Sequence, residues 1–322
     1  MRRSLLSLFA FALLAAGCEN VQAPGDDLAL QTRNALDVLP AGVETVGMMN
    51  LDEARGSDAF DLVSGGELSL DRLQGELGAR FDDFIAATGF NPEENLHRVY
   101  FGAATDPGRG DAPYFVAYAD YDRARLDAYI DDQPDLDLER STYAGVPVYT
   151  SLESEDGGLA FALVNDDMIV ASASAGVRDM LDRIQSGTPG LSSDAEMMAL
   201  IGRAGFPDDM WIAVRGFEPS SDDTNPFGQT GRMMDDLVLS VGFERDGVGL
   251  KATGMTRAGT DAADVADLVR GTVATMKMSV KADDAMLDAL DRVKVREVRG
   301  GVEVDVFLTD AALRSMRSQG DA

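Results

Sequence analysis

Short apolar segments separated by tight turns recur along this chain of 322 residues, and this pattern most restricts its fold. Five of the segments lie close together between residues 99 and 174, where Asn165, Asp166 and Asp167 form a turn between the last two. More follow after residue 205, among them MWIAVRG, LVLSVGFE, GVGLKATGM and VEVDVFL, with glycine in their connectors. Such closely spaced segments are typical of β-hairpins, whose strands pair antiparallel.

Helices are expected between these strands. Asp122, Ser174, Ser193 and Thr260 each precede an apolar pattern with helical spacing, and each is a residue type that caps helix N-termini. Glu196 follows Ser193 at the spacing of a capping box. The chain therefore combines antiparallel sheets with helices, which defines an α+β protein.

The order of elements suggests an internal repeat. Residues 159–184 are predicted as strand, turn, strand and capped helix, and residues 295–316 show the same order. Two further strands and a helix precede each of these stretches. We predict two related subdomains, 39–190 and 205–319, joined by a helix over 191–204. Each is expected to have an antiparallel sheet with helices packed on one face.

The first twenty residues indicate export. Arg2 and Arg3 precede an apolar stretch over residues 5–16, which ends at Gly17 and Cys18, the only cysteine. A charged start, a short apolar core and a small-residue exit are typical of a signal peptide. A membrane-spanning helix needs about 20 apolar residues, which is more than this stretch provides.

The sequence LAAGC at residues 14–18 resembles the lipobox of bacterial lipoproteins, although alanine replaces the usual leucine three positions before the cysteine. The resemblance implies cleavage between Gly17 and Cys18 and acylation of Cys18. Residues 1–17 would then be the signal peptide and residues 18–38 the acylated cysteine with a flexible polar tether. The alternative is an ordinary secretory signal that leaves an unpaired cysteine.

Acidic residues outnumber basic ones by 56 to 28, for a net charge of −28. This excess argues against nucleic-acid binding, which needs Lys and Arg to neutralise phosphates. Aspartate predominates among the acids, and lysine occurs only at the four positions 251, 277, 281 and 294. This bias resembles that of proteins from salt-adapted organisms. About 1 M salt shortens the Debye length to about 3 Å, which screens the repulsion between acidic residues. The alternative is simply an acidic exported protein.

Residues 81–102, FDDFIAATGFNPEENLHRVYFG, resemble a motif of uncharacterised exported bacterial proteins. Those proteins commonly begin their mature domain with Leu-Pro-Ala, which occurs here at residues 39–41. The resemblance implies a duplicated α+β fold and no particular activity. A structural explanation is also available, because Gly89 suits the end of a helix and Pro92 blocks its continuation.

Residues suited to catalysis are scarce. His97 is the only histidine and is expected to be a partly exposed framework residue at the start of a strand. We therefore predict no catalytic residue, cofactor or metal site. Adjacent aspartates keep a calcium site with oxygen ligands as an alternative, although the spaced pattern of calcium-binding loops is absent. A hydrolase with two carboxylates also remains an alternative. Clefts that bind sugars usually display aromatic residues, whereas Trp211, the only tryptophan, is expected in a core strand. Methionine-bound copper is a further alternative, but methionine is more often a core filler.

The segment at residues 218–236 is the longest interruption of the second half. Phe227, Met233 and Met234 lie in it and are candidate contacts for a partner or a ligand. The alternative is that these side chains fold back onto the sheet.

Together these features predict a lipid-anchored extracytoplasmic protein with a non-catalytic binding or assembly role at the cell envelope. The membrane would be contacted through the acyl chains on Cys18, in the cell membrane or the outer membrane. The partner would be an envelope protein. One alternative is a carrier of an apolar ligand or lipid in a cavity lined by Met, Leu and Phe. A carboxylate-based hydrolase is the other.

Overall fold

The computed structural model describes residues 30–57, 60, 79–104, 113–133, 136–152, 158–205, 209–218, 230–280 and 284–320. These residues form two compact units. Unit 1 contains the described residues within 30–52 and 79–195, and unit 2 contains those within 53–60 and 196–320.

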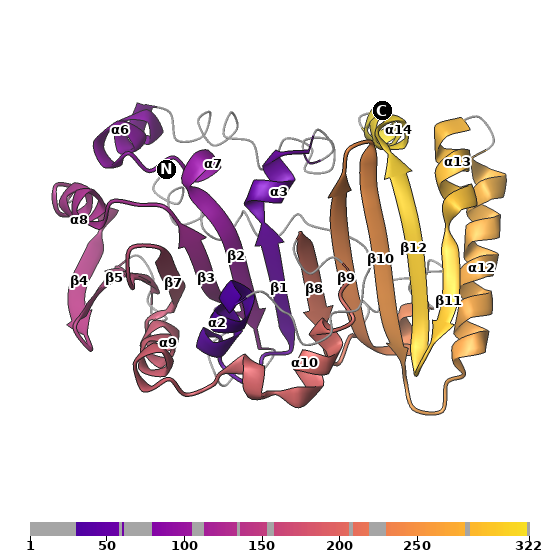
Figure 1. Cartoon of the computed structure of the whole chain (residues 1–322), viewed down its shortest axis with the longest axis horizontal. Coiled ribbons are helices and arrows are strands. Elements are labelled where there is room, and N and C mark those ends of the chain that lie inside the picture. The colour runs from indigo at the N-terminus through magenta and orange to yellow at the C-terminus, as the bar shows by residue number, and fades with distance from the viewer. Residues whose placement is uncertain are drawn as a thin grey trace. The chain divides into compact units, whose positions relative to one another are not determined.

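Unit 1 has an antiparallel sheet with the strand order β1-β2-β3-β7-β6-β5-β4 (Figure 1). The strands are β1 (Thr45–Asn50), β2 (Leu96–Ala103), β3 (Tyr114–Ala119), β4 (Leu138–Tyr143), β5 (Val146–Ser151), β6 (Leu159–Leu163) and β7 (Met168–Ala173). Runs of consecutive residues are buried in β1, β3 and β7. Because successive side chains point to opposite faces, both faces of these strands are covered.

The helices of unit 1 are α2 (Leu30–Val38), α6 (Ala79–Thr88), α7 (Pro92–Asn95), α8 (Arg123–Asp131) and α9 (Ser174–Ser186), with a 3-10 turn η3 (Leu191–Ser193). The short helix α3 (Leu51–Arg55) starts in unit 1, and the chain passes to unit 2 after Asp52. Phe84 of α6 and Leu126 of α8 pack with Val99 on one face of the sheet. Helix α2 lies on the opposite face, where Thr32 Oγ1 is 2.9 Å from Tyr100 Oη. The prediction of helices on one face is therefore wrong for unit 1.

Helix α2 also corrects the predicted tether over residues 18–38. Residues 30–38 are helical, and Ala35 and Leu36 are fully buried. The Leu191 N–H donates to the Leu39 carbonyl oxygen at 2.8 Å, so the residue after α2 is held by η3. This stretch belongs to the core because its apolar residues find partners far along the chain.

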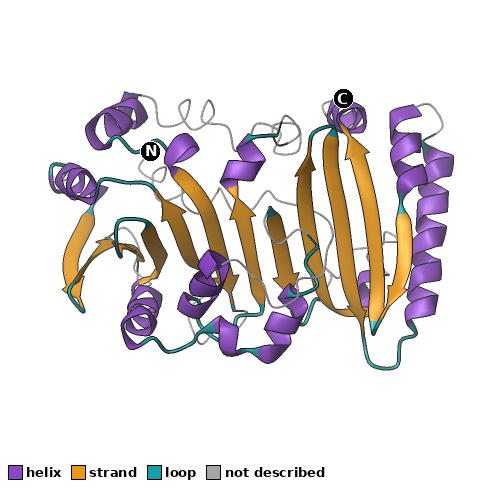
Figure 2. Ribbon diagram, viewed as in Figure 1, coloured by secondary structure: helices purple, strands orange, loops and turns teal. Residues whose placement is uncertain are grey.

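Unit 2 has an antiparallel sheet with the order β8-β9-β10-β12-β11. Its strands are β8 (Met210–Val214), β9 (Met234–Glu244), β10 (Gly247–Thr256), β11 (Lys294–Val298) and β12 (Gly301–Thr309). Its helices are α10 (Ala195–Ile201, which starts one residue before the unit), α12 (Ala262–Ser279), α13 (Asp284–Arg292) and α14 (Asp310–Gly320). Figure 2 shows α12 running alongside β11. Val265 and Ala266 of α12 pack on Val302 of β12.

The two sheets share one topology, which confirms that the halves are related. The order β1-β2-β3-β7-β6 in unit 1 corresponds to β8-β9-β10-β12-β11 in unit 2. A helix follows the third strand in each unit, α8 or α12, and another follows the last of these strands along the chain, α9 or α14. Unit 1 adds the hairpin β4–β5 between these parts. The α+β class with antiparallel sheets is thus confirmed.

The helix boundaries show which local signals were correct. Asp122 caps α8, and Gly89 and Gly187 both have positive φ, at 72° and 62°, as expected at helix ends. The capping box is wrong, because Ser193 lies in η3 and donates to the Gly190 carbonyl oxygen at 2.6 Å. The predicted connecting helix over 191–204 is instead η3 and α10, because Asp194 between them is extended.

Candidate functional site

One end of the unit 1 sheet gathers several loops. Antiparallel pairing aligns the end of β1 with the start of β2, and the start of β2 with the end of β3. It likewise brings the β6–β7 turn to the end of β3. Loops held at the end of a rigid sheet are common places for binding residues. This end therefore contains the candidate site.

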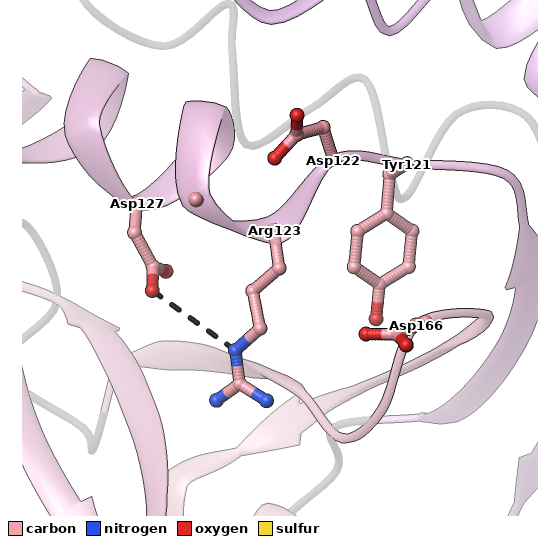
Figure 3. Close-up of a pocket in the computed structure, with 6 residues that line it drawn as sticks. Tyr121, Asp122, Arg123, Asp127 and Asp166 are labelled. Atoms are coloured by element: carbon pink, nitrogen blue, oxygen red, sulfur yellow. Dashed lines mark ion pairs between the residues drawn. The ribbon is translucent and has the colours of Figure 1, made fainter.

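A surface pocket of about 430 Å³ lies at the start of α8. Figure 3 shows its lining of Tyr121, Asp122, Arg123, Ala124, Asp127 and Asp166. The Tyr121 ring and Asp166 lie on one side of it, and Arg123 extends between Tyr121 and Asp127. With three carboxylates and one guanidinium, this lining favours cationic groups over anionic ones.

The turn between β6 and β7 is shaped by Asn165. Its side-chain oxygen accepts hydrogen bonds from the backbone N–H groups of Asp167 (3.2 Å) and Met168 (2.7 Å). The Tyr121 hydroxyl reaches the Asn165 carbonyl oxygen and lies 2.9 Å from that of Met168. Burial raises the pKa of Tyr121, so this tyrosine is a neutral donor that fixes the turn to the start of α8.

Asp127 is the most engaged carboxylate of the pocket. The Tyr149 hydroxyl lies 2.5 Å from Asp127 Oδ1. Asp127 Oδ2 lies 3.6 Å from a guanidinium nitrogen of Arg140 and 4.0 Å from Arg123 Nε. Arg140 also pairs with Asp131 at 2.7 Å and lies over the Tyr149 ring. These contacts tie α8 to β4 and β5, which identifies Asp127 as part of a structural network.

His97 lies at the same end of the sheet, in a β-bulge. Leu96 pairs with Ala119 and Arg98 pairs with Tyr118, so His97 is an extra residue on β2. Its Nδ1 is 3.0 Å from Asp52 Oδ1, and its Nε2 is 3.2 Å from Asp120 Oδ2. Hydrogen bonding and charge from Asp52, followed by Asp120, raise the pKa of His97 despite its partial burial.

A row of polar residues crosses one face of the unit 2 sheet. Cross-strand pairing aligns Trp211 with Ser240, Ser240 with Lys251, and Lys251 with Asp305. Trp211, Ser240 and Lys251 are almost fully buried, so the expected core position of Trp211 is correct. In the described part of the chain, buried side-chain atoms without a hydrogen-bond partner are Trp211 Nε1, Asp305 Oδ1 and Thr253 Oγ1.

Lys251 is the buried cation of an ion-pair network. Its Nζ lies 2.5 Å from Glu303 Oε2, while Arg296 lies 2.7 Å from Glu303 Oε1 and also pairs with Asp305. Two cations and two carboxylates meet here, so the network is balanced in charge. It joins β10, β12 and β11 on the face of β12 opposite Val302.

Only two of the predicted site residues, Met233 and Met234, fall in the described part of the chain. Gly17, Cys18 and Phe227 lie outside the described residues. Met234 is buried against α12, and Met233 packs against the same cluster, so these two side chains fold back, as the alternative expected, and do not form an exposed tip. Among the described helices, none is long and apolar enough to cross a membrane. The described residues also contain no group of three side chains arranged to hold a metal ion.

The partners of His97 and Asp127 were not predicted from the sequence. His97 meets Asp52 from 45 residues earlier and Asp120 from 23 residues later, and no local spacing relates them. The Asn165-Asp166-Asp167 turn was visible in the sequence, and it forms one side of the pocket. Asp122 was likewise visible as a helix cap.

No protein-family model matches the chain, and no curated protein matches it. The fold is similar to crystal structures of TP0453, a protein of Treponema. Crystal form III gives a TM-score of 0.52 at 9% identity, covering 88% of this chain and 98% of TP0453. Crystal form IV gives a TM-score of 0.50 at 10% identity, covering 89% of this chain and 96% of TP0453. At this identity the likeness shows that the two proteins share a fold.

Proposed function

We propose that this chain is a lipid-anchored extracytoplasmic protein with a non-catalytic binding or assembly role at the cell envelope. The sequence LAAGC at residues 14–18, after a short apolar segment, carries the proposal. Two or three acyl chains on Cys18 would hold the protein at a membrane, since one chain alone binds only marginally. The aspartate-rich composition supports a salt-adapted bacterium as the source.

The clusters of charged residues support binding rather than catalysis. Asp127 is engaged by Tyr149 and Arg140, and the two ring nitrogens of His97 are engaged by carboxylates. A general base needs a nitrogen or oxygen free to take a proton from substrate. These groups instead stabilise the loops at the end of the unit 1 sheet.

Membrane fractionation tests the anchor. Cells expressing the full chain are labelled with a palmitate analogue, and their membranes are washed with high salt before detection. We expect wild type and the nearby control variant Asn20→Ser to carry label and stay in the membranes. Cys18→Ser should lose both properties, because it lacks the thiol that is acylated. A wild-type protein without label, or a Cys18→Ser protein that stays in washed membranes, would contradict the anchor.

Native mass spectrometry and cross-linking test the binding role. Cross-linking in intact envelopes should give a discrete adduct with an envelope protein. A mass increment that organic solvent extracts from the purified protein would instead support the alternative of an apolar-ligand carrier. Turnover of a glycoside by the wild type, lost in Asp127→Asn, would support the carboxylate-based hydrolase.

A further inference from the structure

The position of His97 favours a protonated ring. Its Nδ1 faces Asp52 at 3.0 Å and its Nε2 faces Asp120 at 3.2 Å. Ionised carboxylates only accept hydrogen bonds, and a neutral imidazole has one donor nitrogen and one acceptor nitrogen. Both contacts can therefore be hydrogen bonds only when the ring is an imidazolium. Loss of the proton turns one of them into a contact between two acceptors.

The two carboxylates come from different elements. Asp52 is the second residue of α3, and its N–H donates to the Asn50 side-chain oxygen at 3.2 Å. Asp120 follows β3, and its N–H donates to the Asn95 carbonyl oxygen at 2.7 Å. The bulge places His97 on β2 between them. His97 thus connects the start of α3 to the end of β3.

Helix α3 depends on such contacts. It has five residues, far fewer than the roughly 12–15 at which isolated helices become stable. Its end is closed by the Gly56 N–H donating to the Glu53 carbonyl oxygen (3.2 Å) and the Ser57 N–H donating to that of Ala54 (3.1 Å). At this helix the chain leaves unit 1, since Asp52 belongs to unit 1 and Glu53 to unit 2.

We propose that His97, Asp52 and Asp120 form a pH-operated clamp. The protonated ring ties Asp52 at the start of α3 to Asp120 after β3, and loss of the proton breaks one of these two contacts and loosens the start of α3. The charged groups facing the ring are Asp52 from α3 and Asp120 from the end of β3. On β2 itself, Arg98 is engaged elsewhere, since it donates to Gln31 of α2 at 3.1 Å. The clamp is independent of the lipid anchor.

The direction of the pH effect follows from the raised pKa of His97. The folded state binds the proton more tightly than the unfolded state, whose histidine pKa is about 6.5. The clamp is therefore fully formed below that value and is lost as the pH rises through the higher pKa of the folded protein.

A titration by NMR tests the cluster directly. The untagged full chain in detergent contains one histidine, so a single imidazole Hε1 resonance reports His97. We expect its midpoint to lie above that of the same protein unfolded in urea. Asp52→Asn should lower the midpoint more than Asp120→Asn, because Asp52 is the stronger cause of the raised pKa. Asp179→Asn, whose carboxylate pairs with Arg183 instead, should leave the midpoint unchanged. Equal midpoints in the folded and unfolded protein would overturn the proposal.

Hydrogen exchange tests the loosening of α3. After correction for intrinsic rates, protection of the Gly56 and Ser57 amides should fall across the His97 titration in the wild type. In His97→Gln the protection of these two amides should be low and should not change with pH. If His97→Gln does not fold, Asp52→Asn provides the same comparison. Protection that stays constant across the wild-type titration would overturn the clamp even if the pKa of His97 is raised.

Discussion

The phenolic oxygen of Tyr149 lies 2.5 Å from Asp127 Oδ1, and this contact joins β5 to α8. Tyr149 is fully buried, whereas Asp127 lines a surface pocket. The pair therefore connects the core of unit 1 to the candidate site. Burial and the neighbouring carboxylate raise the pKa of Tyr149, so the phenol stays protonated and keeps donating.

Replacing Tyr149 tests this connection. Tyr149→Phe removes the hydroxyl and should lower the free energy of unfolding by about 1–2 kcal/mol, since a hydrogen bond to a charged group is lost. Urea denaturation followed by circular dichroism measures the change. Tyr143→Phe is the matched control, because the Tyr143 hydroxyl bonds to Asp182 on the surface. Equal effects of the two substitutions would show that the Asp127 contact adds no more stability than a surface contact.

Gly89 is required for the junction between α6 and α8. Its φ is +72°, and a Cβ there would lie 2.8 Å from an Arg125 guanidinium nitrogen. Arg125 donates to the Ala86 and Ala87 carbonyl oxygens at the end of α6. Gly89→Ala should therefore cost about 1–2 kcal/mol for the left-handed backbone and more for displacing Arg125.

Gly145 provides the control for that substitution. It has a similar φ of +83°, and a Cβ there would have no neighbour within 4 Å. Gly145→Ala should show the backbone cost alone, so the difference between the two midpoints in urea reports the role of Arg125. A Gly145→Ala variant as unstable as Gly89→Ala would argue against that role.

The Lys251 network predicts a strong dependence of unit 2 on one buried cation. Lys251→Met leaves Glu303 and Asp305 with only Arg296, and breaking a buried ion pair in this way should cost about 3 kcal/mol. Fluorescence of Trp211, the only tryptophan, reports the unfolding of this unit. Lys277→Met, at an exposed pair with Asp291, should cost no more than about 1 kcal/mol. A Lys251→Met protein with wild-type stability would contradict the importance of the network.

Salt dependence tests the proposed salt adaptation. With a net charge of −28, self-repulsion should lower stability at low ionic strength. The melting temperature should rise between about 0.1 M and 1 M KCl, where the Debye length falls from about 10 Å to about 3 Å. A melting temperature that stays constant or falls over this range would leave the salt-adaptation proposal without support.

Much of the fold could be predicted because its signals are local. Strand segments with turn residues predicted the hairpins, and the repeated order of elements predicted the shared topology of the two units. Asp122 and Gly89 marked helix ends because capping depends on the nearest residues. Trp211 was placed in the core from the apolar strand around it.

The rest depends on contacts between distant residues. Helix α2 was predicted as a tether because its sequence is polar, yet Thr32 is buried through a contact with Tyr100, 68 residues away. The environment of His97 depends on a register shift between β2 and β3, and no pattern within β2 predicts it. Met234 was a candidate contact in a predicted loop, but it begins β9 and packs under α12.

Anchoring through Cys18 is tested most directly by mass spectrometry of the N-terminal peptide, from full-length protein expressed and extracted from membranes. We predict a peptide that begins at Cys18 and carries acyl chains. An N-terminal peptide that retains residues 1–17, or one with an unmodified Cys18, would contradict the account.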